Sequence, residues 1–550
     1  MLGDDAPGRV KFKKFCHIPM PIHFVIKHRN QGKIESHKWF FKGFCEYMQP
    51  EFAQIIDCGS IALWNSISRI VKFLDRHKAI GAATGEIEVI LPEKNIETGQ
   101  EFSFSESILL KSQYVEYKTA TYFDKAMESL FNFVSVLPGA FSTFRWKCIN
   151  GHPLDEFLKG SKDEFGTEGS QMSCSTANRY LAEDRIMCLE ILACEGNWTI
   201  SYVPGAKCLT DPPLTLKGLM KQRRRWYNGS LFATYYVLNN LRRVICRKGC
   251  CKALCRNILF FILYIYMLIS TFLAYILVGA FYATFSMFVR SVFKDDDGVA
   301  LEVANVLENI YLTFVFLIIM LSTAVKLDWA EFGFWIASVL MGSLSIVMVV
   351  SSILFSINGE LKLLVALFLA SYILLIFLPI ILNLNRIKIC AFLKGSVYAI
   401  YLAPTYINIL TIYAISNIHD VSWGSRPDTN GKKVDARFAK AEKQREINYK
   451  NYRSNFLIIW MIANIIVANS ITYASRNEHT WILIGIAVFL TGIIGFKIIF
   501  CTLFMLVSKC KSLSLDTGHG QIFKRVSFFV KQINFIAYKR GRIWRQIQRI

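Results

Sequence analysis

The chain has 550 residues, of which 53% are hydrophobic, and it carries a formal net charge of +22. This combination excludes an ordinary globular protein and a disordered one, and it predicts an integral membrane protein with a sizeable polar part. Nucleic-acid binding is the competing explanation for the positive charge, but the sequence contains no groove-reading module and its basic clusters flank apolar runs.

The first part of the chain, up to about residue 241, alternates short β-rich runs with helical patterns. Residues 21–28, 54–60 and 81–91 are predicted as strands, and residues 37–48 and 66–77 have the spacing of helices. This order predicts an α/β layer. The charged N-terminus lacks the apolar core of a cleavable signal, so we expect this part on the cytosolic side.

A basic, cysteine-rich segment follows at 242–257. It contains four cysteines between Cys246 and Cys255. Such a segment is typical of a membrane surface, and acylation or metal binding are the alternatives.

Seven apolar stretches come next, each roughly long enough to cross a bilayer. They lie near 258–285, 303–325, 332–357, 361–383, 395–415, 455–474 and 481–507. The loop from Lys432 to Arg453 holds eight basic and three acidic residues, and the tail from Ser508 to Ile550 holds ten basic residues and one acid. Because basic loops stay on the cytoplasmic side, an even number of crossings must precede Asn417. The sequence therefore predicts six spans, with one of the first five stretches lying in the interface or re-entering.

The predicted fold class is an α/β cytosolic domain followed by an all-α transmembrane bundle. The predicted divisions are a cytosolic domain at 1–241, an interfacial segment at 242–257, transmembrane helices at 258–415, a cytosolic loop at 416–453, further transmembrane helices at 454–507 and a basic cytosolic tail at 508–550.

Acidic residues occur at two places where a chemical role competes with a local one. Asp57 follows an apolar strand-like run, a position that presents a ligand to a divalent cation or simply ends the strand in a turn. Glu183 and Asp184 precede a helical run, where acids are commonly caps. Beside a buried site, one of them would serve as a general base.

The stretch KQRRRWYNGS at 221–230 joins three arginines to a glutamine and a tryptophan. Contact with lipid headgroups accounts for the arginines alone. It leaves the tryptophan and the glutamine unexplained, whereas guanidinium groups bind phosphate oxygens and an indole stacks on a sugar ring. The stretch therefore indicates a site for a sugar diphosphate and a glycan end.

Nine stretches, in order, resemble the conserved blocks of the chitin synthases, a family of processive membrane glycosyltransferases. They are KHRNQGKIESHKWFF (27–41), DCGS (57–60), GEI (85–87), QYVEY (113–117), VLPGAFS (136–142), LAEDR (181–185), KQRRRWYNGS (221–230), LAPTYINILTIYA (402–414) and NIHDVSWG (417–424). The block QRRRW alone would also admit cellulose or hyaluronan synthases.

The resemblance implies a GT-A-type domain, shortened at its N-terminus, that transfers N-acetylglucosamine from UDP-N-acetylglucosamine to a growing chitin chain with inversion and exports the polymer through its spans. The implied catalytic base is Asp184, with Glu183 and Arg185 in support, and Asp57 is the implied ligand of Mg²⁺ or Mn²⁺. The block that holds the diphosphate and the acceptor comprises Gln222, Arg223, Arg224, Arg225 and Trp226. Lys27 and Lys33 add charge near the donor or are solvated. The loop that lies between the site and the channel comprises Val136, Leu137, Pro138, Gly139 and Ala140, and the block of unassigned role comprises Ser422, Trp423 and Gly424.

Two departures from the family pattern bear on these expectations. The chain lacks an upstream VTxYxE-like strand and an ADGR-like turn that bind uridine, so either the true start lies upstream of Met1 or the chain is a divergent copy. The second departure is SWGSRPD at 422–428, where a lysine or arginine and then a glycine are commoner after SWG. A catalytically inactive membrane scaffold or partner subunit, and a synthase of another polysaccharide, stay open. The resemblance implies a multi-pass protein of the plasma membrane with a cytosolic catalytic domain, and it leaves a homodimer open.

Overall fold

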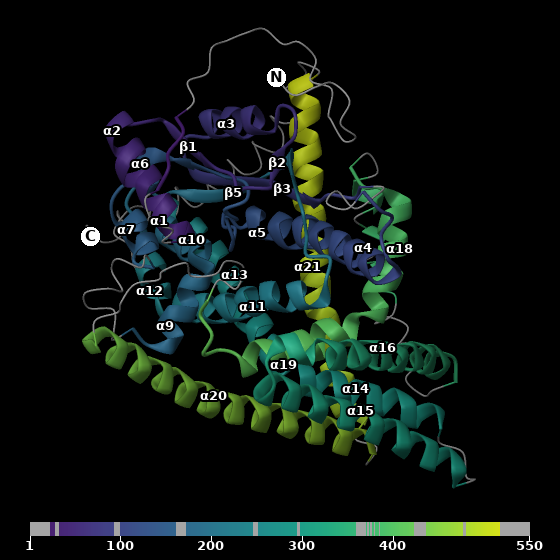
Figure 1. Cartoon of the computed structure of the whole chain (residues 1–550). Helices are drawn as coiled ribbons and strands as arrows, with labels where there is room; N and C mark the ends of the chain where they lie inside the picture. The colour runs from purple at the N-terminus through teal and green to yellow at the C-terminus, as the bar shows by residue number, and fades with distance from the viewer. Residues whose placement is uncertain are drawn as a thin grey trace, which may run out of the picture.

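The structure is a computed structural model (Figure 1) that describes residues 23–27, 32–92, 99–160, 172–245, 251–293, 298–358, 370, 373–374, 377–378, 380–383, 386–422, 436–476 and 480–516. In these ranges the side chains of residues 251–255, 356, 358, 436–441, 480–483 and 509–516 are left out of the description.

A five-stranded mixed sheet forms the centre of the N-terminal part. Its order is β1-β4-β3-β5-β2, and only the pair β3 and β5 is parallel. The strands are β1 (Phe52–Ile55), β2 (Ile61–Ala62), β3 (Ile80–Val89), β4 (Ser142–Arg145) and β5 (Thr199–Thr210).

Strand β3 is buried along nearly its whole length, including three polar residues. Two of these, Glu86 and Glu88, face the fully buried Lys118, whose Nζ lies 2.5 and 2.7 Å from their carboxylates. Burying the two carboxylates is tolerable because two ammonium groups balance them, that of Lys118 and that of Lys207, which lies 3.1 Å from Glu88 Oε2.

Helices cover both sides of this sheet (Figure 1). They are α1 (Lys33–Lys38), η1 (Trp39–Cys45), α2 (Glu46–Met48), α3 (Ser66–Arg76), α4 (Phe104–Thr119), η2 (Ala120–Lys125), α5 (Ala126–Leu130), α6 (Trp146–Ile149), α7 (His152–Leu158), α9 (Cys174–Arg179), η4 (Tyr180–Ala182), α10 (Glu183–Ala193), α11 (Leu216–Asn239) and α12 (Leu241–Ile245).

Long apolar helices make up the rest of the described chain. They are α13 (Cys251–Tyr275), α14 (Leu277–Val292), α15 (Val299–Ala324), α16 (Leu327–Asn358), α18 (Ile389–Tyr401), η5 (Thr405–Ile409), α19 (Leu410–Ser416), α20 (Ala436–Arg476) and α21 (Thr480–Asp516). Within the described ranges, five helices are long and apolar enough to cross a membrane, and a sixth span results if the pair 389–401 and 405–416, bent by 61°, counts as one.

Helix α11 connects the two parts because it belongs to both hydrophobic cores. Its first turns, with Leu219 and Met220, pack in the core of the apolar helices α14, α15 and α16. Near its end, Val237 packs in the core beneath the sheet. The QRRRW block therefore lies where the sheet domain meets the apolar helices.

The predicted fold class, an α/β domain followed by a region of apolar helices, is confirmed. The strands predicted near 54–60 and 81–91 and the helices predicted at 37–48 and 66–77 are present as β1, β3, the run from α1 to α2, and α3. The strand predicted at 21–28 is wrong over its described part, because residues 23–27 have no regular structure. The domain divisions stay predictions, and most of the apolar stretch 361–383 lies outside the described residues.

Candidate active site

Three predicted residues from separate elements meet at one edge of the sheet. Asp57 follows β1, Lys33 begins α1 and Glu183 begins α10. The Lys33 ammonium lies 3.0 Å from Asp57 Oδ1 and 3.8 Å from Glu183 Oε1. Asp184 follows Glu183 in the first turn of α10, where the helix dipole favours acids. We call Lys33, Asp57, Glu183 and Asp184 the carboxylate cluster.

The pKa values of Glu183, Asp184 and Lys33 are all raised, by burial for the two acids and by neighbouring carboxylates for the lysine. Burial raises the pKa of Glu183 to about 7, although Lys33 opposes the rise. Burial also raises the pKa of Asp184, against the opposing charges of Arg185 and Lys33. Burial alone would lower the pKa of Lys33, but Glu183, Asp57 and Asp184 raise it above its ordinary value. The cluster thus combines a firmly charged ammonium with two carboxyl groups, those of Glu183 and Asp184, that hold a proton more tightly than usual.

The loop Val136–Ala140 lies directly on this cluster. A Cβ atom on Gly139 would stand 2.5 Å from Lys33 Nζ and 3.5 Å from Asp57 Oδ1, so no larger residue fits there without displacing the lysine. The loop is tied to the sheet, because Phe141 N donates to Pro138 O at 3.0 Å and Thr84 Oγ1 donates to Phe141 O at 2.8 Å.

The three arginines of α11 contact three different neighbours, because successive residues of a helix point about 100° apart. Arg223 donates to Glu116 Oε2 at 2.8 Å, and its guanidinium lies 4.1 Å from the centre of the Trp226 ring. Arg225 lies close enough to Glu183 and Asp57 for their charges to affect its pKa, which burial and Arg224 lower overall.

Arg224 is 1% exposed and contacts the segment before residue 423. It pairs with the carboxylate and the carbonyl of Asp420, and it donates to Ser422 O at 2.7 Å. Through these contacts, Arg224 holds Asp420 and Ser422 of the NIHDVSWG block. Within the predicted block of unassigned role, Ser422 is described, whereas Trp423 and Gly424 lie outside the described residues.

A cavity of about 450 Å³ opens beside the arginine block, at the junction with the apolar helices. Its wall contains Arg185, Arg223, Trp226 and Glu116 on one side and hydroxyl-bearing residues of α13 and α19, such as Thr271 and Thr411, on the other. Aromatic and hydroxyl groups in one wall suit a sugar, whose ring has an apolar face and polar edges. The indole of Trp226 is 40% exposed here, so it is open to a ligand.

Two predicted residues are less directly placed. Lys27 Nζ donates to Gly32 O at 3.0 Å, directly before Lys33. The side-chain oxygen of Gln222 is buried and has no hydrogen-bond partner among the described residues.

Sequence reasoning missed the acids that position the arginines. Glu116 and Asp420 bind Arg223 and Arg224, yet neither stands out by local pattern. Their only signal was that each lies in a stretch that resembles a family block. Tyr406, which lines the same cavity, was missed for the same reason.

The comparisons with known proteins define the class first. Residues 4–241 match the family model of the chitin synthase-like glycosyltransferase domain, so this part of the chain is a glycosyltransferase domain of that type. The match covers the sheet, the carboxylate cluster and α11.

The chain as a whole is homologous to chitin synthases. It is 28% identical to chitin synthase 2 of Mycosarcoma maydis over 543 residues, covering 85% of this chain and 49% of the relative. It is 27% identical to chitin synthase 1 of Phytophthora sojae, with 84% and 53% covered, and 30% identical to chitin synthase 2 of Rhizopus oligosporus, with 78% and 52% covered. The chain thus spans about half the length of these curated relatives.

Proposed function

We propose that the protein is a chitin synthase that transfers N-acetylglucosamine from its UDP donor to the 4-hydroxyl of a growing chitin chain, with inversion. Two observations support the proposal: Lys33 pairs with Asp57 and Glu183, whose charges also reach Arg225, and the chain neighbours Arg185 and Trp226 line the cavity. Phosphate-binding cations, carboxyl groups and a sugar platform are the three requirements of glycosyl transfer from a nucleotide sugar.

Asp184 is the proposed base. A sugar hydroxyl is a far weaker acid than a carboxylic acid, so its proton must leave as the new bond forms. Burial raises the pKa of Asp184 and so makes its carboxylate a stronger base than one in water. Glu183, the residue before Asp184, lies 3.8 Å from the Lys33 ammonium. Arg185, the residue after Asp184, lines the cavity where the acceptor would lie.

The cations stabilise the departing UDP. Negative charge grows on the diphosphate as the bond to the sugar breaks, and preorganised positive groups in a buried site stabilise that charge. Lys33 is suited to this role because it pairs with Asp57, and Arg225 because it lies within range of the charges of Glu183 and Asp57. Gln222 and Arg223 lie beside Arg225 in the QRRRW block of α11, and we propose that they support its binding of the diphosphate.

Asp57 is the residue that would hold Mg²⁺ or Mn²⁺. The described residues contain no group of three His, Cys, Asp or Glu side chains that could hold a metal ion alone. One carboxylate nevertheless suits Mg²⁺, which usually takes one or two protein carboxylates together with substrate phosphates and water. The Asp57 side chain is 41% exposed, against 5% for Glu183, so Asp57 is the accessible oxygen ligand. The ion would neutralise charge on the donor diphosphate.

The cavity is the proposed acceptor site and the start of the export path. The tip of the chitin chain would stack on Trp226, and the older units would pass between α13 and α19. Export of a wall polymer requires a path out of the cell, so we assign the protein to the plasma membrane, with the sheet domain in the cytosol.

The test is incorporation of sugar from labelled UDP-N-acetylglucosamine by purified protein with Mn²⁺, scored as polymer that chitinase degrades. Asp184→Asn should abolish incorporation at equal protein level, and Glu195→Gln, an exposed acid just after α10, should not. Full activity of Asp184→Asn would remove the base assignment. Incorporation from UDP-glucose or UDP-glucuronate instead would indicate another polysaccharide, and incorporation from no donor would favour a scaffold.

A further inference from the structure

Glu190 is a buried carboxylate that the proposed reaction does not use. It lies on α10, seven residues after Glu183, and is 0% exposed. Two turns of helix separate it from the carboxylate cluster, about 10 Å at a rise of 1.5 Å per residue. A carboxylate at such depth requires compensating bonds, since an unpaired buried charge is strongly unfavourable.

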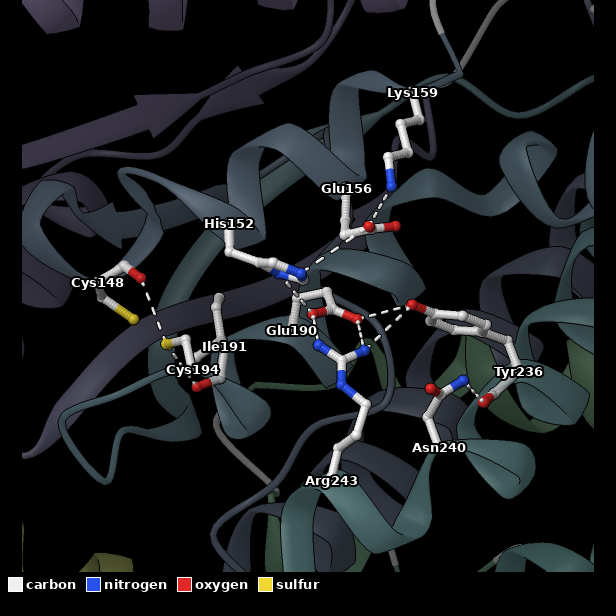
Figure 2. Close-up of polar contacts among 10 residues, drawn as sticks. All are labelled: Cys148, His152, Glu156, Lys159, Glu190, Ile191, Cys194, Tyr236, Asn240 and Arg243. Carbon is white, nitrogen blue, oxygen red and sulfur yellow. Dashed lines mark hydrogen bonds and ion pairs between the residues drawn. The ribbon is translucent and has the colours of Figure 1, made fainter. Parts of the chain in front are cut away.

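Three other elements supply those bonds, as Figure 2 shows. Arg243 of α12 binds both oxygens, with Nη1 at 2.9 Å from Oε1 and Nη2 at 2.8 Å from Oε2. Tyr236 of α11 donates its hydroxyl to Oε1 at 2.8 Å, and His152 Nδ1 of α7 lies 3.2 Å from Oε2. Bidentate and charge-assisted bonds of this kind fix orientation as well as energy.

The contact with Tyr236 matters most because α11 also carries the arginine block. The segment η4–α10 and α11 meet at a second point, where a Cβ on Gly229 would stand 2.8 Å from Ala182 Cβ. The order of the two contacts, Ala182 with Gly229 and Glu190 with Tyr236, means that the two helices run side by side in the same direction. The contacts are about 10 Å apart along each helix.

Two contacts at that separation restrict the helices more than one does. The close approach at Gly229 and the apolar packing of α10 in the core set the distance between the helices but contain no directional bond between α10 and α11. The bonds to Glu190 are directional. They therefore fix where Asp184, at one end of α10, lies relative to Trp226 and Arg225 on α11.

We propose that Glu190 is a positioning residue for sugar transfer, which acts by clamping α10 to α11 through Tyr236 and Arg243. This inference rests on the proposed function, because it assigns the reacting groups to those two helices. The donor groups Asp57 and Lys33 lie outside α10, and Arg225 lies on α11, so a shift of α10 moves Asp184 more than it moves these groups. Loss of the clamp should thus impair proton transfer to Asp184 more than donor binding.

The test compares Glu190→Gln with Glu156→Gln in the purified full chain. Glu156 belongs to the same patch in Figure 2, where it pairs with His152 of α7 and with Lys159, the residue after α7, but it makes no bond to α10 or α11 in that patch. The Glu190→Gln variant should fold, because Arg243 is 39% exposed and stays solvated without its carboxylate partner. We expect kcat per donor-binding site to fall about tenfold or more, since a displacement of 1 Å can cost about 10²-fold. The donor KM should stay within about twofold.

Tyr236→Phe should lower kcat less, by a few-fold, and the double variant with Glu190→Gln should fall no further than Glu190→Gln alone, because both changes act through one network. A purely structural role would reduce the number of donor-binding sites and leave kcat per site unchanged, and that result would overturn the proposal.

Failure of the proposed function has a different signature, namely a parent chain that transfers no sugar at all. In that case amide hydrogen exchange over residues 183–193 tests whether Glu190 holds α10 against α11. Exchange should be at least tenfold faster in Glu190→Gln than in Glu156→Gln, and equal rates would show that Glu190 does not hold α10.

Discussion

Replacing Arg224 and replacing Arg225 should have different consequences, although the two residues are neighbours in one basic run. Arg224 is 1% exposed and binds Asp420 and the Ser422 carbonyl, whereas Arg225 adjoins Asp57 and Glu183. We therefore propose that Arg224 serves stability and that Arg225 serves donor binding. The comparison tests whether direction on the helix, and not positive charge alone, determines function.

The magnitudes follow from the two environments. Removing one partner of a buried ion pair costs about 3–5 kcal/mol. The Asp420 side chain is 42% exposed and can be rehydrated, so we expect the lower end, about 3 kcal/mol, for Arg224→Met. A hydrogen bond to a charged group is worth about 1.5–3 kcal/mol, so loss of a phosphate contact in Arg225→Met should raise the donor KM roughly tenfold to 100-fold.

The assay measures two quantities for each variant, the unfolding midpoint in detergent by tryptophan fluorescence and the donor KM of the folded fraction. Arg224→Met should lower the midpoint and leave KM unchanged, and Arg225→Met should do the reverse. Arg242→Met, at an exposed arginine of α12, is the matched control and should change neither. A raised donor KM with an unchanged midpoint in Arg224→Met would refute the reasoning.

Three further outcomes are expected. The profile of kcat/KM against pH should rise through about pH 7 if a carboxyl group of the cluster must be ionised, because burial raises the pKa of Glu183 to about 7. In Lys33→Gln the rise should move to higher pH, because the ammonium 3.8 Å away favours the ionised form. Lys118→Met should lower the free energy of unfolding by about 3–5 kcal/mol because it removes the ion-pair partner of the buried Glu86, whereas Glu88 keeps Lys207 at 3.1 Å, and adding Glu86→Gln should recover part of that loss. Trp226→Ala should raise the KM for a chitin oligosaccharide several-fold, since ring stacking is worth about 1 kcal/mol, with little change in donor KM.

Each of these outcomes has a control and a contradicting result. An unshifted pH profile in Lys33→Gln would mean that another group controls ionisation. Lys78→Met, at an exposed lysine, should leave stability unchanged, and an equal loss there would show a general effect of removing lysine. Tyr235→Ala, at an exposed ring of α11, should leave the acceptor KM unchanged, and so a similar effect of both ring deletions would argue against stacking on Trp226.

Local patterns predicted the elements whose hydrophobic period is regular. The second half of strand β3 alternates Glu86 and Glu88 with Ile87 and Val89, and α3 has buried residues at Ile70 and Leu74, four apart. Strand β5 was not predicted because Pro204 and Gly205 interrupt it, and such residues commonly end a strand. The structure accommodates them in a bulge, where the partners of β3 jump from Tyr202 to Lys207. Gly205 has φ +83°, and a Cβ on Gly85 would stand 2.4 Å from Ala206 O, so two glycines make the bulge feasible.

The strand prediction at 21–28 was wrong for the opposite reason. Its composition is typical of a strand, but a strand needs a partner for its backbone groups. Phe24 and Ile26 are 87% and 81% exposed, and residues 23–27 pair with no strand among the described residues. Composition describes a preference, whereas pairing depends on which other segments are available.

The candidate site shows the same division between local and long-range information. Each chemical residue type was visible in the sequence, but the distance between Asp57 and Glu183 depends on a sheet that orders β1, β4 and β3 across 90 residues of chain. Their common contact is Lys33, which no local pattern distinguishes from a solvated lysine. The sheet order therefore decides which of several acids becomes part of the cluster.

The arginine run illustrates the limit of a motif as evidence. Three consecutive guanidinium groups suggest a single phosphate-binding patch, but a helix turns by about 100° per residue and directs them to Glu116, to Asp420 and toward Asp57. One arginine positions Trp226, one holds the segment before residue 423, and one adjoins the carboxylate cluster. If the run acts in this way, its length of three reflects three neighbours of one helix, and exchanging any one arginine for lysine would remove a distinct function instead of a third of one function.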